Sequence, residues 1–247
     1  LEDKYEKTKI SIEEIFSNDS DLRVSRYASK EGKEVESILL KYPQDEVKKI
    51  KDLVEFSTSG HYYSTSGQVI ENSSEISPYI RVSDLVSNEN EFDLDISKVE
   101  RKISQEKALP KTIIDFSAIL VSTFALNLKR TYFKFTGQPI VIGSDIIALK
   151  MKADVNVEHF LLQLHSRLVQ IQVEMMSSGT TINRISNEDF LNIQIILPRL
   201  LEEQKRQVFE MRGVIEEKAI AEEKLSIAKE EIEATEYDVI AAIAHNL

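Results

Sequence analysis

Acidic residues followed by a glutamate and a lysine form the pattern in this chain that most closely imitates a catalytic site. Asp84, Asp93 and Asp95 precede Glu100 and Lys102. In metal-dependent nucleases, carboxylates of this kind hold Mg²⁺ and a lysine assists the attacking water. Such short patterns arise easily in a chain that is 30% charged. We therefore interpret these residues as a solvated turn and predict neither a catalytic nor a metal site.

Other catalytic patterns are missing or have the wrong spacing. His159 and His165 lie six residues apart on a predicted helix, which puts them about 240° apart around its axis and prevents them from sharing a metal ion. The sequence contains no cysteine, no glycine-rich phosphate loop and no Asn/Asp-Pro-Pro-Tyr/Phe methyltransferase motif. We expect a non-catalytic protein that binds no cofactor.

Several polar, aromatic and basic side chains are better suited to contact a nucleic acid. Gly179, flanked by small hydroxyl residues, permits a sharp turn in the segment that ends at Arg184. We expect this loop, an aromatic loop at 61–63, a strand arginine and a basic arm at 129–134 to meet on one surface. The candidate DNA-binding residues are His61, Tyr62, Tyr63, Arg81, Lys129, Arg130, Lys134, Thr180, Asn183 and Arg184.

The predicted contacts divide into two kinds. Lys129, Arg130 and Lys134 are expected to contact phosphates, whereas side chains of the 61–63 and 179–184 loops are expected to position or read bases. Structural alternatives remain open for some of them. The tyrosines of the 61–63 loop can close the edge of a core, and Arg81 can simply be solvated. Asp84 can cap the turn that follows it.

Both strands and helices are expected to position these residues. Apolar alternation predicts strands at 77–85, 118–126, 146–150 and 193–197. Helices are expected at 34–40, over 157–176 as one element, and at 187–191, where Ser186 supplies an N-cap. The fold class is therefore α+β, with a mixed β-sheet and flanking helices. Three parts are expected: a lead-in at 1–46, a DNA-binding domain at 47–200 and a long helix at 201–247.

The last 47 residues indicate a coiled coil. Apolar residues recur at three- and four-residue spacing after Leu201, with a phase shift near Gly213. A charged helix of this length needs a partner to bury its apolar stripe. We expect a homodimer or a partner helix, and a break near Gly213 rather than one uniform rod.

Composition and charge permit these interpretations. The net charge is −11, but residues 47–200 carry 17 basic and 18 acidic side chains, so most of the acidity lies in the flanks. This distribution permits DNA binding without supporting it. No apolar run reaches the length of a membrane span and no signal-peptide pattern opens the chain. We expect a cytoplasmic protein with no membrane partner, and a fragment of a longer chain because the first residue is Leu.

Three segments resemble the specificity subunits of type I restriction-modification systems. They are Tyr79 to Leu85, Ala118 to Ser122, and Gly179 to Gln204, where Ser-Gly-Thr-Thr is followed by a short helix, a strand, Pro198 and a long helix. The resemblance covers about two thirds of the chain. It implies one target recognition domain and one spacer helix, whereas a full subunit carries two of each. It also implies three partners: double-stranded DNA, a DNA methyltransferase subunit and, through the complex, a restriction subunit.

Two further interpretations belong to other classes of protein. The chain can be the recognition end of a fused nuclease-methylase enzyme. Alternatively, the segment around His245 weakly resembles the phosphoacceptor helix of a sensor histidine kinase, which would make the chain a sensory or dimerisation segment.

Overall fold

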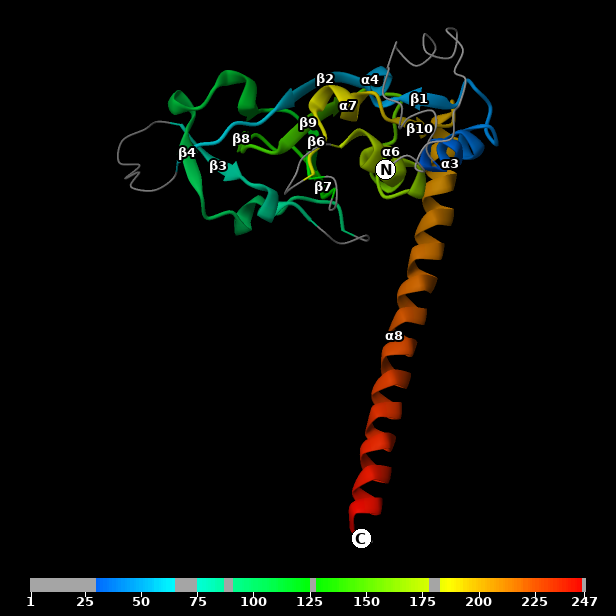
Figure 1. Ribbon diagram of the computed structural model, residues 1–247. Helices are drawn as coiled ribbons and strands as arrows, with labels where there is room; N and C mark the ends of the chain where they lie inside the picture. Colours follow the sequence, from blue (N-terminus) through cyan, green and yellow to red (C-terminus); the bar gives the residue numbers. More distant parts are fainter. Residues whose placement is uncertain (1–29, 65–74, 87–90, 125–127, 178–182, 246–247) are drawn as a thin grey trace, which may run out of the picture. The chain divides into compact units, whose positions relative to one another are not determined.

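The computed structural model describes residues 30–64, 75–86, 91–124, 128–177 and 183–245, with side chains described as far as residue 232 (Figure 1). The chain separates into two compact units, Leu1–Lys205 and Arg206–Leu247. No helix in the described ranges is both long enough and apolar enough to cross a lipid bilayer.

The first unit contains two four-stranded sheets and one two-stranded pair. One sheet has the strand order β2-β9-β6-β7, and the labels of Figure 1 follow this order from top to bottom. Its strands are β2 (Val54–Ser59), β6 (Ala118–Ser122), β7 (Arg130–Phe133) and β9 (Ile146–Met151). The other has the order β4-β3-β8-β5, with β3 at Ile76–Ile80, β4 at Lys102–Ser104, β5 at Ile113–Ile114 and β8 at Ile140–Ile142. β1 (Val47–Lys49) pairs with β10 (Gln194–Ile196).

The pairing is antiparallel except between β3 and β8, which run parallel with Tyr79 opposite Val141. The predicted α+β class with a mixed sheet is confirmed. Every residue of β6 is buried, and β6 lies between β9 and β7 in its sheet. Ile119 and Leu120 therefore meet apolar neighbours on both faces, as expected of a central strand that reads as a continuous apolar run.

The helices of the first unit are short. They are α3 (Lys30–Leu39), α4 (Ile50–Leu53), α5 (Val157–Gln163), α6 (Arg167–Met176) and α7 (Asn187–Leu191). The capping prediction for α7 is confirmed, because the Ser186 hydroxyl accepts a 3.0 Å hydrogen bond from Asp189 N and also contacts the Asp189 carboxylate.

The single helix predicted over 157–176 is wrong. The chain leaves the helix after Gln163, and Ser166 starts a new one by accepting a hydrogen bond from Val169 N. Serine competes well for this role because its hydroxyl satisfies a backbone donor at the first turn. His159, predicted at the surface or the edge of the core, is completely buried on α5.

The end of another predicted strand also differs from the prediction. The strand expected over 77–85 ends at Ile80, and Val82–Asp84 form a 3₁₀ turn. Tyr79 and Ile80, expected on opposite sides of a half-exposed strand, are both buried because β3 is covered on both faces. By contrast, the apolar spacing of Val47, Ile50, Leu53 and Val54 predicts a helical turn leading into a strand, and this is confirmed by the short helix α4 ahead of β2.

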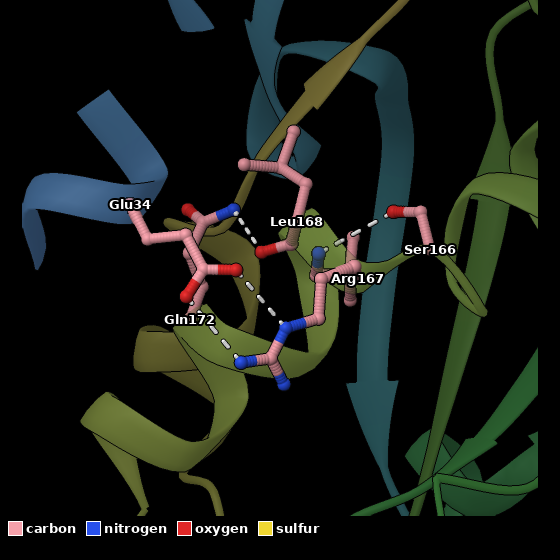
Figure 2. Close-up of polar contacts among 6 residues, drawn as sticks. Glu34, Ser166, Arg167, Leu168 and Gln172 are labelled. Carbon is pink, nitrogen blue, oxygen red and sulfur yellow. Dashed lines mark hydrogen bonds and ion pairs between the residues drawn. The ribbon is translucent and has the colours of Figure 1, made fainter. Parts of the chain in front are cut away.

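Helix α6 connects the lead-in to the two-stranded pair. Figure 2 shows the Arg167 guanidinium directed at the Glu34 carboxylate of α3, with nitrogen–oxygen distances of 3.2 and 3.4 Å. This pairing raises the pKa of Arg167. One turn further along, the Gln172 side chain donates to Gln194 O at 2.7 Å and accepts from Gln194 N at 2.8 Å. The Gln172 amide thus pairs with β10 as a neighbouring strand would.

Helix α8 runs without interruption from Leu201 to His245. The break expected near Gly213 is therefore wrong, because one glycine costs a long helix only about 1 kcal/mol. Within the second unit, several large apolar side chains of α8 are exposed, including Phe209 at 81%. The coiled-coil assignment remains a prediction.

Candidate nucleic-acid interface

Four separate segments of the chain meet at the turn Gly143–Asp145, which joins β8 of one sheet to β9 of the other. Gly60, at the end of β2, donates to Ile146 O at 2.9 Å, and His61 N donates to Ile142 O at 3.3 Å. On the other sheet, Gly143 N donates to Ile80 O at 2.8 Å. The end of β2 and the end of β3 are thereby held at one place.

Two glycines make this approach possible. A Cβ atom at Gly60 would lie 1.8 Å from the carbonyl oxygen of Gly143, and a Cβ at Gly143 would lie 2.9 Å from the carbonyl oxygen of Ile80. Only a residue without a side chain fits such contacts. Asp145 completes the turn with a φ of +64°, a left-handed conformation that Asp adopts more readily than most residues.

The remaining two segments reach the turn through Asp145. Thr123 N, just after β6, donates to Asp145 O at 2.9 Å, and the Arg184 guanidinium lies 3.2 Å from the Asp145 carboxylate. Arg184 also lies over the ring of Phe124, 5.4 Å from its centroid, and forms a backbone bridge with that residue. Arg184 is half exposed on its side chain, so it can present charge while it is held in place.

The aromatic loop at 61–63 has one strongly exposed ring and one ring that packs against the core. Tyr62 is 65% exposed. Tyr63 instead packs edge-on against the buried Tyr79 ring at 5.7 Å and against His61 at 5.1 Å. The Tyr79 hydroxyl accepts from Tyr63 N at 3.1 Å and donates to His61 O at 3.3 Å. Tyr63 and Tyr79 therefore support a loop from which His61 and Tyr62 are exposed.

Arg81 joins the same cluster because its guanidinium lies 5.3 Å from the centroid of the Tyr79 ring. Asp84 caps the 3₁₀ turn Val82–Asp84 rather than a turn that follows it, since its carboxylate accepts from Arg81 N at 2.7 Å and is also paired with Arg101. The carboxylate is therefore engaged by two partners in a structural role, although the turn it caps is not the predicted one.

The basic arm at 129–134 does not act as one surface. Lys129 lies at the same end of the sheet as the Gly143–Asp145 turn, because its backbone pairs with Ser122, the neighbour of Thr123. Lys134 is exposed beyond the opposite end of β7. Arg130 is only 5% exposed and donates to Leu161 O at 2.7 Å. The expectation of a solvent-facing Arg130 is therefore wrong, because α5 and the Phe92 ring cover this side chain.

The predicted residues thus gather only in part. Those linked to the Gly143–Asp145 turn are His61, Tyr62, Arg81, Lys129, Asn183 and Arg184, where Asn183 is exposed and precedes Arg184. We call these six residues the turn cluster. Thr180 lies outside the described residues. The turn itself was not predicted, although Gly143-Ser-Asp between two apolar strands signals a tight connection.

The nuclease-like acidic pattern is dispersed among structural roles. Asp95 caps a 3₁₀ turn by accepting from Ser97 N at 3.1 Å. The hydrogen bonds from Ser97 and the nearby Lys98 hold the pKa of Asp95 below its usual value. Asp93 lies in a backbone bridge with Tyr132. Among the residues whose side chains are described, no group of three histidine or acidic residues is arranged to hold a metal ion.

Comparisons with solved structures find three similar chains, one of which has a TM-score of 0.50 and shows the same fold. One similar chain comes from a structure described as the basis of complex assembly and conformational transition of the type I restriction-modification system. It is 18% identical to this chain, with a TM-score of 0.50, and the match covers 75% of this chain and 44% of that one. The HsdS subunit from Thermoanaerobacter tengcongensis is 16% identical, with a TM-score of 0.49, over 76% and 44%. The S subunit from M. genitalium is 13% identical, with a TM-score of 0.38, over 69% and 38%.

The chain therefore spans less than half the length of each of these solved structures. No curated protein sequence matches it. These comparisons support neither the fused nuclease-methylase nor the sensory hypothesis. The sequence profile of the type I restriction modification DNA specificity domain matches residues 44–233, which include both sheets and most of the described part of α8. The chain belongs to the type I restriction modification DNA specificity domain family.

Proposed function

We propose that this chain recognises a specific DNA sequence for a type I restriction-modification system. Residues 47–200 act as one target recognition domain, and 201–247 act as the spacer helix. The observation that carries this proposal is the family match over 44–233, which spans both of these parts. The turn cluster supplies a chemical basis, because exposed aromatic, amide and guanidinium groups are held there on the rigid ends of strands.

The turn cluster suits DNA in two ways. Arg81, Arg184 and Lys129 provide positive charge for phosphates, and Tyr62 and Asn183 provide exposed groups for bases. Arg184 is kept in position by Asp145 and Phe124, which reduces the entropy lost when it binds.

The partners follow from the proposed function. A DNA methyltransferase subunit and, through it, a restriction subunit carry out the chemistry, while this chain chooses the site. A single recognition domain reads half of a divided target, so a second domain must come from another copy or another part of the assembly. Pairing of the 201–247 helix, as a homodimer or with a partner subunit, would supply that connection.

Selection from a random pool of DNA duplexes tests the proposal. The 247-residue chain, with its methyltransferase partner present and at low salt, should enrich one short sequence motif. Binding should weaken steeply as salt rises, because released counterions contribute most of the affinity. Enrichment of no motif, together with equal affinity for selected and scrambled duplexes, would show that the chain does not read sequence.

Matched variants test the turn cluster. Tyr62→Ala and Asn183→Ala should each cost about 1–3 kcal/mol of binding free energy on the selected sequence and little on a scrambled one. Lys129→Ala should weaken binding to both duplexes and lower the salt slope by about 1. Lys134→Ala, at the opposite end of the same strand, is the control and should change neither. If Lys134→Ala acts as Lys129→Ala does, the DNA lies elsewhere.

A further inference from the structure

The segment Gln105–Thr112 connects β4 to β5 and contains two 3₁₀ turns, Gln105–Lys107 and Pro110–Thr112. It holds two lysines, Lys107 and Lys111, and one glutamate, Glu106, and so carries a small excess of positive charge in an acidic protein. Lys107 and Lys111 are exposed, and Leu109 between them is 42% exposed.

Side-chain hydrogen bonds fix this segment to both sheets. The Gln105 amide donates to the Ser77 hydroxyl of β3 at 3.0 Å, and the Thr58 hydroxyl of β2 donates to Lys111 O at 2.8 Å. The backbone positions of the two lysines are therefore set by bonds to strands on either side.

Tyr63 connects the segment to the aromatic loop. Its hydroxyl accepts from Leu109 N at 2.8 Å and lies 2.9 Å from the buried Thr112 hydroxyl, while its ring touches His61. The residue next to Tyr63 is the exposed Tyr62. One tyrosine therefore fixes the spacing between the loop that presents Tyr62 and the backbone that presents Lys107 and Lys111.

We propose that Lys107 and Lys111 bind DNA phosphates next to the bases approached by the 61–62 loop, and that Tyr63 is the positioning residue that holds the two elements in register. Phosphates fit this surface because the exposed ammonium groups of Lys107 and Lys111 are positively charged donors for phosphate oxygens, and phosphate contacts set the register from which bases are read. This inference rests on the proposed function and adds a second contact element to the turn cluster.

The dependence of DNA affinity on salt tests the lysines. The full chain is measured on the selected duplex and on a scrambled duplex over a range of salt concentrations. The double variant Lys107→Gln/Lys111→Gln should reduce the slope of log affinity against log salt by about 1.8 on both duplexes, since each phosphate contact contributes about 0.9. The matched control is Lys41→Gln/Lys134→Gln, which removes the same charge from exposed lysines elsewhere and should leave the slope unchanged.

The outcomes separate this inference from the proposed function. If the wild-type chain selects a motif but the Lys107→Gln/Lys111→Gln variant and the Lys41→Gln/Lys134→Gln control both keep the wild-type salt slope, the lysine contacts are overturned and sequence recognition stands. The same conclusion follows if the salt slopes of these two variants fall by equal amounts. If the wild-type chain binds no DNA, both proposals fail.

Tyr63→Phe tests the positioning role, because it keeps the ring and removes the hydroxyl that bonds Leu109 and Thr112. It should lower the salt slope in the wild-type background and have no further effect in the Lys107→Gln/Lys111→Gln background. An equal loss in both backgrounds, or no loss in either, would overturn the assignment of Tyr63 as the link to these lysines.

Discussion

Arg130 Nε donates a 2.7 Å hydrogen bond to the backbone carbonyl of Leu161, in the last turn of α5. In a continuing helix that carbonyl would accept from His165 N, but His165 N bonds Leu162 O instead. The arginine therefore takes the place of a donor that is lost where α5 ends, a role that basic side chains often play at helix C-termini. Its charge also lies over the Phe92 ring at 5.6 Å.

Replacing Arg130 should lower stability far more than replacing the other basic residues of the arm. Arg130→Met leaves the Leu161 carbonyl without this donor inside the fold, and we expect the free energy of unfolding to fall by about 1–3 kcal/mol. Urea denaturation followed by fluorescence measures this loss. Lys134→Met, exposed just beyond the same strand, should stay within about 0.5 kcal/mol of wild type. Equal losses would contradict the buried role of Arg130.

Gly60→Ala should displace the Gly143–Asp145 turn. The added methyl group would meet backbone atoms that cannot rotate away, so the free energy of unfolding should fall by about 1–3 kcal/mol. DNA affinity should fall as well, because His61 follows directly and its carbonyl is bound by Tyr79. A variant with wild-type stability would show that the two glycines are not in close contact.

Gly213→Ala should have the opposite effect. A Cβ at Gly213 meets no atom within 4 Å, and alanine is favoured over glycine in a helix by about 0.8–1.0 kcal/mol. Thermal unfolding followed by circular dichroism at 222 nm should show a more stable α8. An unchanged or lower melting temperature would show that Gly213 does not cost α8 the expected stability.

The apolar stripe of α8 should drive association. Leu225 and Ile232 lie on the predicted seam and are 57% and 59% exposed, respectively. Replacing both with Glu should shift sedimentation of the full chain to the monomer, because the seam would bury two charges. Ile227→Glu removes a similarly exposed side chain from another side of the helix and is the control. A wild-type chain that sediments as a monomer at all concentrations would rule out the homodimer.

Local signals in the sequence predicted local structure well. The Ser186 cap, the buried strand predicted over 118–126 and the long final helix each depend on residues within a few positions of one another, although the observed strand β6 ends at Ser122. The break between α5 and α6 was missed because apolar spacing continues across it. Only the Ser166 hydroxyl marks it, and serine also occurs within helices.

The candidate site was harder to predict because it depends on distant contacts. Lys129, Arg130 and Lys134 look alike in the sequence, yet the register of β7 and the position of α5 give each a different environment. The two roles of Tyr62 and Tyr63 likewise depend on Tyr79 and Leu109, which no local pattern connects with them. Residue type indicated what the side chains can bind, but only the tertiary structure distinguished surface from core.

Long-range strand pairs in the first unit are nested along the chain. Along the sequence, the pair Tyr79–Val141 falls within the stretch bounded by the pair Val54–Met151. That stretch in turn falls within the one bounded by the pair Val47–Ile196. The entropy cost of closing a loop grows with the length of free chain, so each inner pair shortens the loop that the next one must close. Folding by successive short closures would begin at the local pairs β6–β7 and β3–β4, continue through β3–β8 and β2–β9, and end at β1–β10. During synthesis, all of the inner pairs can form before Ile196 has left the ribosome, so the β1–β10 pair, which closes the longest loop, forms last.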